Sequence, residues 1–176
     1  MPVSAATTIT VRAESNPEKR RALQESLTAL LPKWFGSAES NRHYASQAEL
    51  LSGWVAHLDG RERGLLLVKR HGTWSAEIYW MAVDPACHRC GVGTALVDTV
   101  AAEMTEERRK LLFAYTLAPD SRNEHYAQTR KFYESRGFFL AVTDHGAEAL
   151  SDGSHPMAYF VKLLHRQAAN LHRLSP

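Results

Sequence analysis

The sequence is poor in cysteine, in long apolar runs and in excess charge. It has two cysteines in 176 residues, with no second Cys-x-x-Cys and no His-x-His pair to complete a zinc site. No apolar run approaches the length that spans a bilayer, and the N-terminal stretch MPVSAATTIT lacks the basic start and apolar segment of a signal peptide. The formal net charge of +2 is too small to indicate nucleic acid or a membrane surface as a partner. We therefore expect a cytoplasmic protein.

The length and composition suit a single globular domain. Of the 176 residues, 44% are hydrophobic and 23% are charged, and this size is enough for a sizeable core. No internal repeat, low-complexity tract or linker divides the chain. We expect one domain over residues 1–176, with its core at about 9–164 and a C-terminal tail, 165–176, of weak helical character.

The pattern of apolar residues predicts strands that alternate with helices. Strands are expected at 7–13, 54–58, 64–70, 74–83, 111–117, 138–143 and 157–164, with a polar turn at 59–63. Helices are expected at 17–31, 44–51 and 91–109, and a fourth helix is expected to end near residue 136, before a glycine. An irregular segment at 33–42 precedes the second helix. This order predicts an α/β (α+β) fold in which a single sheet has helices on both faces.

The segment HRCGVGTAL, residues 88–96, carries the strongest local signal. Gly91 and Gly93 follow an apolar strand and open a predicted helix. Glycines allow the backbone to approach a ligand closely, and the unpaired amides of a helix N-terminus attract an anion. The segment therefore predicts a phosphate-binding turn, although a tight strand-to-helix turn without a ligand has the same pattern.

A second segment, TRKFYESRGF at residues 129–138, sharpens this interpretation. Together the two segments resemble the two halves of a GNAT-family acetyltransferase, a member of a superfamily that uses acetyl-CoA. The resemblance covers about residues 9–163 and is strongest at 77–93 and 126–138. It implies a single mixed, mostly antiparallel sheet flanked by helices on both faces. It also implies an N-acetyltransferase that moves an acetyl group from acetyl-CoA to a primary amine by direct attack, without a metal.

The resemblance also assigns the cofactor-binding residues. The family signature is Gln or Arg, two residues, Gly, one residue, then Gly or Ala. Gly91 and Gly93 match it, whereas His88 stands where Gln or Arg is usual. The implied binding residues are Ala82, Val83, His88, Arg89, Cys90, Gly91, Val92, Gly93 and Thr94. The backbone of Ala82 and Val83 would face the thioester, where an amide can stabilise a developing oxyanion.

Glu77 is the candidate general base. A carboxylate inside an apolar strand is costly unless it is paired, hydrated or functional, and a base is needed because an alkylammonium has no lone pair for attack. In some family members a glutamate at this spacing takes the proton of the amine, directly or through water. Strict alternation predicts that Glu77 shares its face with Tyr79, Met81 and Val83. The alternative is a glutamate that reaches solvent from a strand end.

Tyr133 is the candidate general acid. It belongs to the family signature Phe-Tyr-x-x-x-Gly-Phe, which Phe132, Tyr133, Gly137 and Phe138 match. By resemblance, its hydroxyl would lie near the thioester sulfur and protonate the leaving thiolate. The alternative is core packing, because aromatic residues at helical spacing more often belong to a core than to a catalytic site.

Two alternatives to catalysis remain open. The fold could serve as a CoA-binding regulatory module, which the departure at His88 favours. Cys87 and Cys90 could instead form a redox pair or half of a zinc site. The acceptor is equally open, because a small amine, a peptide N-terminus and a lysine side chain all fit, and the sequence indicates no oligomeric state. Four aromatic residues could line an acceptor pocket, although core packing is the more common role for such residues: Trp34, Phe35, Tyr44 and Trp54.

Overall fold

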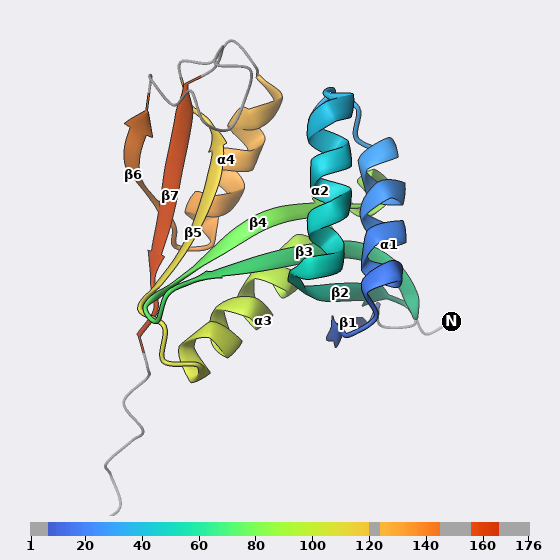
Figure 1. Cartoon of the computed structure of the whole chain (residues 1–176), viewed down its shortest axis with the longest axis horizontal. Coiled ribbons are helices and arrows are strands. Elements are labelled where there is room, and N and C mark those ends of the chain that lie inside the picture. The colour runs from blue at the N-terminus through green and yellow to red at the C-terminus, as the bar shows by residue number, and fades with distance from the viewer. Residues whose placement is uncertain (1–6, 120–123, 145–155, 166–176) are drawn as a thin grey trace, which may run out of the picture.

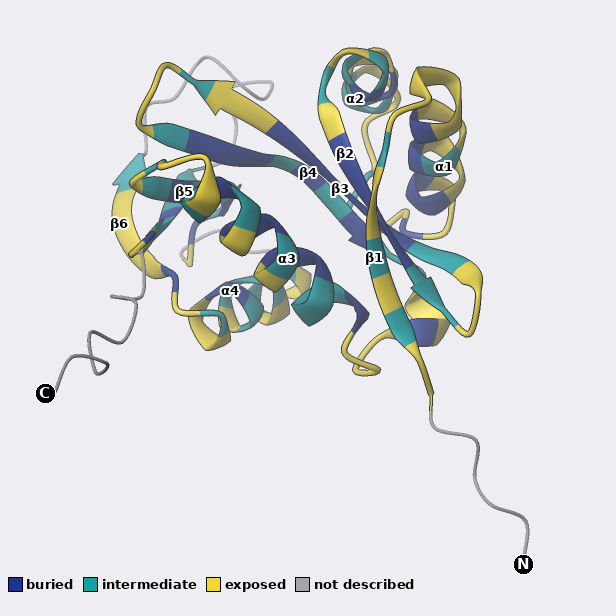
Figure 2. Cartoon of the chain, turned by 90° about the horizontal axis from the view of Figure 1, so that it is seen from below, coloured by how far each residue is buried: buried dark blue, intermediate teal, exposed yellow. Residues whose placement is uncertain are grey.

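Within the described residues, seven strands form one sheet that has two α-helices against each face (Figures 1 and 2). This computed structural model describes residues 7–119, 124–144 and 156–165, so the predicted C-terminal tail lies outside it from residue 166 onward. The strands are β1 (Ile9–Glu14), β2 (Ser52–Leu58), β3 (Arg61–His71), β4 (Ser75–Val83), β5 (Leu111–Leu117), β6 (Phe139–Asp144) and β7 (Met157–Leu163). The helices are α1 (Pro17–Ala29), α2 (Ala38–Leu50), the 3-10 helix η1 (Pro85–Cys87), α3 (Val92–Glu106) and α4 (His125–Ser135).

The sheet is mixed and mostly antiparallel. Its strand order is β1-β2-β3-β4-β5-β7-β6, and β4 with β5 is the parallel pair. That pair is short, because it joins only residues 75–78 to residues 111–114. Since β4 continues to Val83 and β5 to Leu117, the two strands separate in the middle of the sheet (Figure 1). The predicted fold class is confirmed.

Two apolar clusters hold the helices on the sheet. One cluster, which includes Leu27 and Leu65, packs α1 and α2 onto β2–β4. The other, which includes Leu96 and Phe160, packs α3 and α4 onto the opposite face (Figure 2). Each large apolar side chain buried in this way contributes about 1.5–3 kcal/mol of transfer free energy. Gly64 of β3 lets α3 approach closely, because a Cβ there would lie 3.0 Å from Leu96 Cδ1.

Helix α2 is longer than predicted. The sequence predicts an irregular segment over 33–42 and a helix only from residue 44, but α2 begins at Ala38. Ser37 caps this earlier start, because its hydroxyl oxygen accepts a hydrogen bond from the backbone N–H of Ser40 at 3.2 Å. The first turn is polar and exposed, so it adds nothing to the apolar periodicity from which the helix was predicted.

Left-handed residues move two other predicted boundaries. Only Asp59 and Gly60, with φ of +49° and +77°, form the turn that was predicted over 59–63, as in a two-residue hairpin. The three residues that follow them belong to β3. Helix α3, predicted to reach residue 109, ends at Glu106, because Arg108 has φ of +64° and cannot continue a right-handed helix.

A β-bulge interrupts the pairing of β3 with β4. Leu67 pairs with Trp80, whereas the next residue of β3, Val68, pairs with Ile78. Tyr79 is therefore an extra residue on β4, and it shifts every later side chain of that strand to the other face.

The bulge overturns the predicted alternation along β4. Tyr79 and Trp80 both pack toward α1 and α2, whereas Met81 and Val83 pack against the cluster on the α3 side. Ile78 is buried in that α3-side cluster. Because side chains alternate between the two faces, the residue before it, Glu77, faces α1 and α2. The prediction that Glu77 shares its face with Met81 and Val83 is therefore wrong, because strict alternation makes no allowance for an inserted residue.

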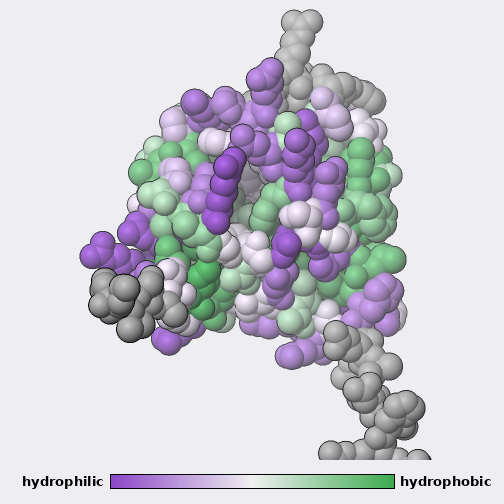
Figure 3. All heavy atoms as spheres, turned by 180° about the vertical axis from the view of Figure 1, so that it is seen from behind, coloured by the Kyte–Doolittle hydropathy of each residue, from purple (hydrophilic) through white to green (hydrophobic). Residues whose placement is uncertain are grey.

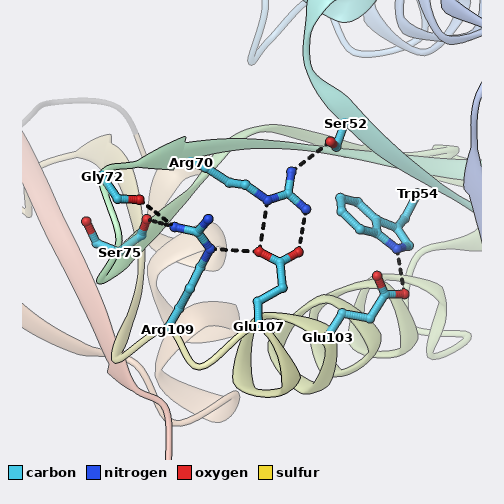
Figure 4. Close-up of polar contacts among 8 residues, drawn as sticks. All are labelled: Ser52, Trp54, Arg70, Gly72, Ser75, Glu103, Glu107 and Arg109. Atoms are coloured by element: carbon cyan, nitrogen blue, oxygen red, sulfur yellow. Dashed lines mark hydrogen bonds and ion pairs between the residues drawn. The ribbon is translucent and has the colours of Figure 1, made fainter.

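A network of charged side chains fastens the C-terminal end of α3 to the sheet (Figure 4). The carboxylate of Glu107 accepts hydrogen bonds from Arg70 at 2.6 and 3.0 Å and from Arg109 at 2.9 Å. Arg109 also donates to the carbonyl oxygens of Gly72 and Ser75, at 3.1 and 2.8 Å. The Arg70 guanidinium, helped by Arg109, lowers the pKa of Glu107 to about 2. The network thus fixes the turn between β3 and β4.

Candidate active site

The turn at residues 88–94, here called the glycine turn, leads from η1 into α3. Gly91 is the N-cap of α3 and has φ of +87°, a conformation that favours glycine, and it offers no side chain to cap the helix. In the described part of the chain, the first backbone amides of α3 have no hydrogen-bond acceptor; they are those of Val92, Gly93 and Thr94. Capping side chains begin α1 and α2. The start of α3 is therefore the one of these three that leaves its positive end open to an anion.

Gly93 brings three elements together at this turn. A Cβ at this position would lie 3.4 Å from the Phe132 ring of α4 and 3.6 Å from Cγ2 of Val83 at the end of β4. A Cβ alone would make ordinary contact with both side chains, whereas a branched side chain such as that of valine would press on them. The face that carries α3 and α4 shows a hollow bordered by hydrophilic side chains (Figure 3).

The two basic residues of the glycine turn differ in their freedom. The Nε2 of His88 lies 3.0 Å from the carbonyl oxygen of Val83 and donates to it, and its ring meets Trp34 edge-on at 6.4 Å. Arg89 is exposed, has φ of +64° and forms no ion pair with any described residue. The guanidinium of Arg89, rather than the imidazole of His88, is thus available to an anion at the turn.

The end of β4 presents one backbone amide toward the separated β5. The N–H of Asp84 donates to the carbonyl of Arg63 at 2.8 Å, so the backbone polar groups of Asp84 point toward β3. In an antiparallel ladder the preceding residue, Val83, then points its N–H and C=O the other way, and Ala82 points back to β3. The sequence assigned both Ala82 and Val83 to the cofactor, and the geometry favours the amide of Val83.

Glu77 lies where β4 and β5 begin to separate. It is 5% exposed and is paired in register with Phe113, one residue before the last pair of the two strands. Its Oε2 lies 2.6 Å from Nε2 of His71, whose side chain is 37% exposed. His71 is the diagonal neighbour of Glu77, because Lys69 is its direct partner across the hairpin. The carboxylate is thus buried and paired, and it does not reach solvent from a strand end.

Three tyrosines surround this carboxylate. Burial is the main cause of the raised pKa values of Tyr44 of α2, Tyr79 of β4 and Tyr115 of β5. The negative charge of Glu77 raises all three further, and at Tyr79 the neighbouring Tyr44 contributes as well. The pKa of Tyr79 is raised to about 12. All three phenols are therefore neutral at physiological pH. We call Glu77, His71 and these tyrosines the Glu77 cluster.

Tyr133 is part of the core beneath α4. Its residue is 5% exposed, and its ring contacts Phe132, Phe138 and Phe160 at centroid distances of 5.5, 5.3 and 6.2 Å. Burial raises the pKa of Tyr133, so the hydroxyl stays protonated at neutral pH. These contacts show that the Tyr133 ring packs in the core. Its role as a proton donor stays a prediction.

The two cysteines are both free. Cys87 is buried, and this burial raises the pKa of its thiol, whereas Cys90 is exposed. A thiol with a raised pKa is a weak nucleophile and metal ligand at neutral pH. In the described ranges, no three or more His, Cys, Asp or Glu side chains come together as a metal site.

The aromatic residues considered for an acceptor pocket divide between the two faces. Trp54 is wrongly placed by that expectation, because its Nε1 donates to Glu103 of α3 at 2.8 Å, on the α3 side of the sheet (Figure 4). Trp34, Phe35 and Tyr44 do pack on the α1–α2 face. The difference follows from alternation in β2, where Trp54 takes the face opposite to its buried neighbour.

Sequence reasoning missed His71 and the rings of β5 and β7. A signal for His71 existed, because the short turn after it sets a hairpin register in which it lies diagonally from Glu77. No such signal exists for Tyr115 and Tyr159, which become neighbours at 4.4 Å only because β5 pairs with the last strand of the sheet.

A mixed sheet that separates between β4 and β5, with an uncapped helix start beside the opening, is the architecture of an acyl-CoA-dependent acyltransferase. Residues 50–139 match the acetyltransferase (GNAT) domain family. The chain belongs to this family. The predicted family and enzyme class, an acyltransferase that uses acetyl-CoA, are confirmed.

Solved structures agree with the fold. A GNAT-family acetyltransferase from Desulfovibrio desulfuricans is 20% identical, with a TM-score of 0.73 over 90% of this chain and 100% of that one. The ribosomal-protein-S18-alanine N-acetyltransferase of Escherichia coli is 19% identical, with a TM-score of 0.66 over 94% and 99%. An aminoglycoside 6'-N-acetyltransferase complexed with coenzyme A is 17% identical, with a TM-score of 0.63 over 92% and 99%.

No curated protein matches the sequence significantly. Among the described helices, none is both long and apolar enough to cross a membrane.

Proposed function

We propose that the protein is an N-acetyltransferase that transfers the acetyl group of acetyl-CoA to a primary amine by direct attack. One observation carries the proposal. The uncapped start of α3 lies on one side of the sheet, the paired carboxylate of Glu77 lies on the other, and β4 and β5 separate between them. A cofactor and an amine can therefore approach from opposite faces and meet at the opening, which direct transfer requires.

The glycine turn fits the pyrophosphate of CoA. Amides from Gly91 to Thr94 would bond its oxygens, since they lack acceptors among the described residues and no capping side chain competes for them. The N–H of Cys90, also an expected binding residue, donates instead to the carbonyl of Cys87 at 3.3 Å. The free guanidinium of Arg89 would add positive charge. His88 would act indirectly, through its bond to the carbonyl of Val83, which fixes the end of β4.

Val83 supports the acyl group. Its N–H points toward the separated β5, where a donor can bond the thioester carbonyl more strongly as negative charge develops on the oxygen. The backbone of Ala82, which is paired with β3, holds this part of β4 straight. Acetyl-CoA supplies the activated acyl group, and the chain supplies position and charge.

Glu77 would act as the general base, directly or through water. One oxygen of its carboxylate is held by His71, which leaves the other to accept the proton of the amine. His71 is a positioning residue in this scheme. It is the last residue of β3, next to the turn that Arg109 fastens through the carbonyls of Gly72 and Ser75. Figure 4 shows these bonds of Arg109.

Tyr133 would donate the proton that the leaving thiolate takes up. Its position in α4, behind the Phe132 ring that contacts the start of α3, places it on the cofactor side of the sheet. Because burial raises its pKa, the phenol is protonated at neutral pH and has a proton to donate to the sulfur as the C–S bond breaks.

The acceptor is a small-molecule or peptide amine in this proposal, and the protein acts in the cytoplasm without nucleic acid, membrane or metal as a partner. Structural neighbours act on a ribosomal protein alanine and on aminoglycosides, so the fold serves amines of very different size. An assay of acetyl-CoA consumption against a panel of amines tests the proposal. Acetylation of at least one amine, lost in a Glu77→Gln variant that still binds CoA, is expected; consumption unaffected by that variant would contradict it.

A further inference from the structure

Aromatic rings form a continuous ladder beside Glu77, on the face of the sheet turned away from α3 and α4. The ladder consists of His71, Phe113, Tyr115 and Tyr159, whose successive ring centroids lie 5.3, 5.4 and 4.4 Å apart. It runs from the end of β3 across β5 to β7. Phe113 is the register partner of Glu77, so the carboxylate lies at one end of the ladder.

The ladder rings are only partly covered. All four residues are of intermediate exposure, although their neighbours in β5 and β7, such as Ala114 and Phe160, are buried on the other face. Helices α1 and α2 lie over β2–β4, and among the described elements neither extends over β5 and β7 (Figure 1). A half-exposed row of four rings is unusual for a solvated sheet face and is typical of a surface that binds an apolar ligand.

The charges around Glu77 determine the orientation in which a ligand would bind. Glu77 is a buried carboxylate, and the tyrosines around it are neutral phenols at physiological pH. An ammonium group at Glu77 would thus meet one negative charge and the faces of aromatic rings, which also attract cations. Lys69, the direct partner of Glu77 in β3, places its ammonium 5.5 Å from the centre of the Tyr79 ring.

We propose that the ladder is the binding site for the body of the acceptor, and that the acceptor is a primary amine with an aromatic ring one or two carbons from its nitrogen. This rests on the proposed function, since that function places the reacting amine at Glu77. The ammonium binds at Glu77, and the ring of the acceptor packs on Tyr115 and Tyr159. Such ring contacts favour an aromatic over an aliphatic amine of equal charge.

The test measures binding in a complex that cannot react. Wild-type protein saturated with CoA, which has no acetyl group, is titrated by calorimetry with 2-phenylethylamine and with n-butylamine. We expect 2-phenylethylamine to bind at least about tenfold more tightly, which is a modest value for burial of a ring in a preformed site. Equal affinities, or tighter binding of butylamine, would overturn the proposal.

Two ring variants and one control locate the preference. Tyr115→Leu and Tyr159→Leu should each reduce the preference for 2-phenylethylamine several-fold, whereas Trp74→Leu, at a ring that is 61% exposed outside the ladder, should leave it unchanged. A preference that survives both tyrosine variants would overturn the proposal. Thermal unfolding checks that the variants are folded. We expect them to be folded, because both tyrosines are partly exposed.

The outcome is separable from that of the proposed function. If 2-phenylethylamine binds with the expected preference but no amine is ever acetylated, the site is supported and catalysis is refuted. If amines are acetylated without regard to a ring, catalysis is supported and the ladder proposal is refuted. If neither binding nor acetylation is seen, both are refuted.

Discussion

The glycine turn and the Glu77 cluster are the two halves of the site, and they are built in opposite ways. The glycine turn is a contiguous run of seven residues, 88–94, that presents backbone amides and one free guanidinium. The Glu77 cluster gathers side chains from α2, β3, β4 and β5, and it depends on the pairing of those strands. A site that holds a constant cofactor can be made of backbone, whereas a site that holds a variable acceptor is made of side chains from many elements.

The difference implies that binding and chemistry can be separated by mutation. Changes in the glycine turn should remove affinity for the cofactor, and changes in the Glu77 cluster should slow transfer while the cofactor still binds.

Gly93→Val should abolish CoA binding. The added methyl groups occupy the space in which the pyrophosphate approaches the helix amides, and they also press on Phe132. We expect at least a 100-fold loss of affinity, or about 2.8 kcal/mol. The measurement is the rise in melting temperature when CoA is added, which should vanish. Gly36→Val is the control, because a Cβ there meets only the carbonyl oxygen of Pro32 at 3.6 Å, and its melting temperature should still rise with CoA.

Glu77→Gln should lower kcat by ~10²–10⁴-fold, the usual range for loss of a general base. Higher pH should partly restore the rate, because more of the amine is then free to attack without help. A pH–rate profile with a substrate amine checks this. Glu62→Gln, a glutamate of β3 that pairs with Lys19, serves as the control and should behave as wild type. If the loss of kcat in Glu77→Gln did not depend on pH, the carboxylate would have a structural role and would not act as a base.

Tyr133→Phe should lower kcat by about 10²-fold, at the lower end of the range for general acids. The change removes one hydroxyl and keeps the ring that packs on Phe138 and Phe160, so the fold should be nearly as stable. Because burial raises the pKa of Tyr133, wild type should lose no activity through this group as the pH rises to about 10. Unlike Glu77→Gln, the variant should gain nothing from higher pH. An unchanged kcat would reduce Tyr133 to core packing.

His71→Leu should lower kcat by about 10–100-fold, because the Glu77 carboxylate loses the donor that orients it. His71→Gln keeps an N–H near the same place and should restore most of the rate. Steady-state kinetics should show the change in kcat, with the KM for acetyl-CoA unaffected. Equal losses in both variants would mean that the imidazole acts otherwise than by positioning Glu77.

Glu107→Gln should affect stability alone. The ion pairs that lower the pKa of Glu107 from its usual 4.5 to about 2 stabilise the folded state above about pH 4.5, and this contribution is lost as the pH falls toward 2. Since the pairs are partly exposed, we expect a loss of about 1 kcal/mol at pH 7, or ~2–4 °C in melting temperature. The difference from wild type should close near pH 2. Glu106→Gln, the exposed neighbouring residue, should show neither effect.

The same contrast explains how much the sequence could predict. The glycine turn was found because its signal is local: Gly91, the helix after it and the strand before it lie within one segment. The sheet and its helices followed from periodicity, as did the placement of Tyr133 on α4. Errors arose where one residue changes the geometry, as at the bulge of Tyr79, the cap of Ser37 and the left-handed Arg108.

The Glu77 cluster was only half predictable. Glu77 stood out because a carboxylate is unusual in an apolar strand, but its partner was not found, since no local pattern marks a diagonal pair across a hairpin. The rings of Tyr115 and Tyr159 meet through pairing of β5 with the last strand, about forty residues later, and periodicity carries no information on such register.

Calorimetric titration of acetyl-CoA into Glu77→Gln and Gly93→Val, beside wild type, tests the central claim that one face binds the cofactor and the other carries the base that activates the amine. We expect Glu77→Gln to bind one equivalent with the affinity of wild type, and Gly93→Val to show no binding although it is folded. Loss of affinity in Glu77→Gln, or wild-type affinity in Gly93→Val, would contradict this division of the site.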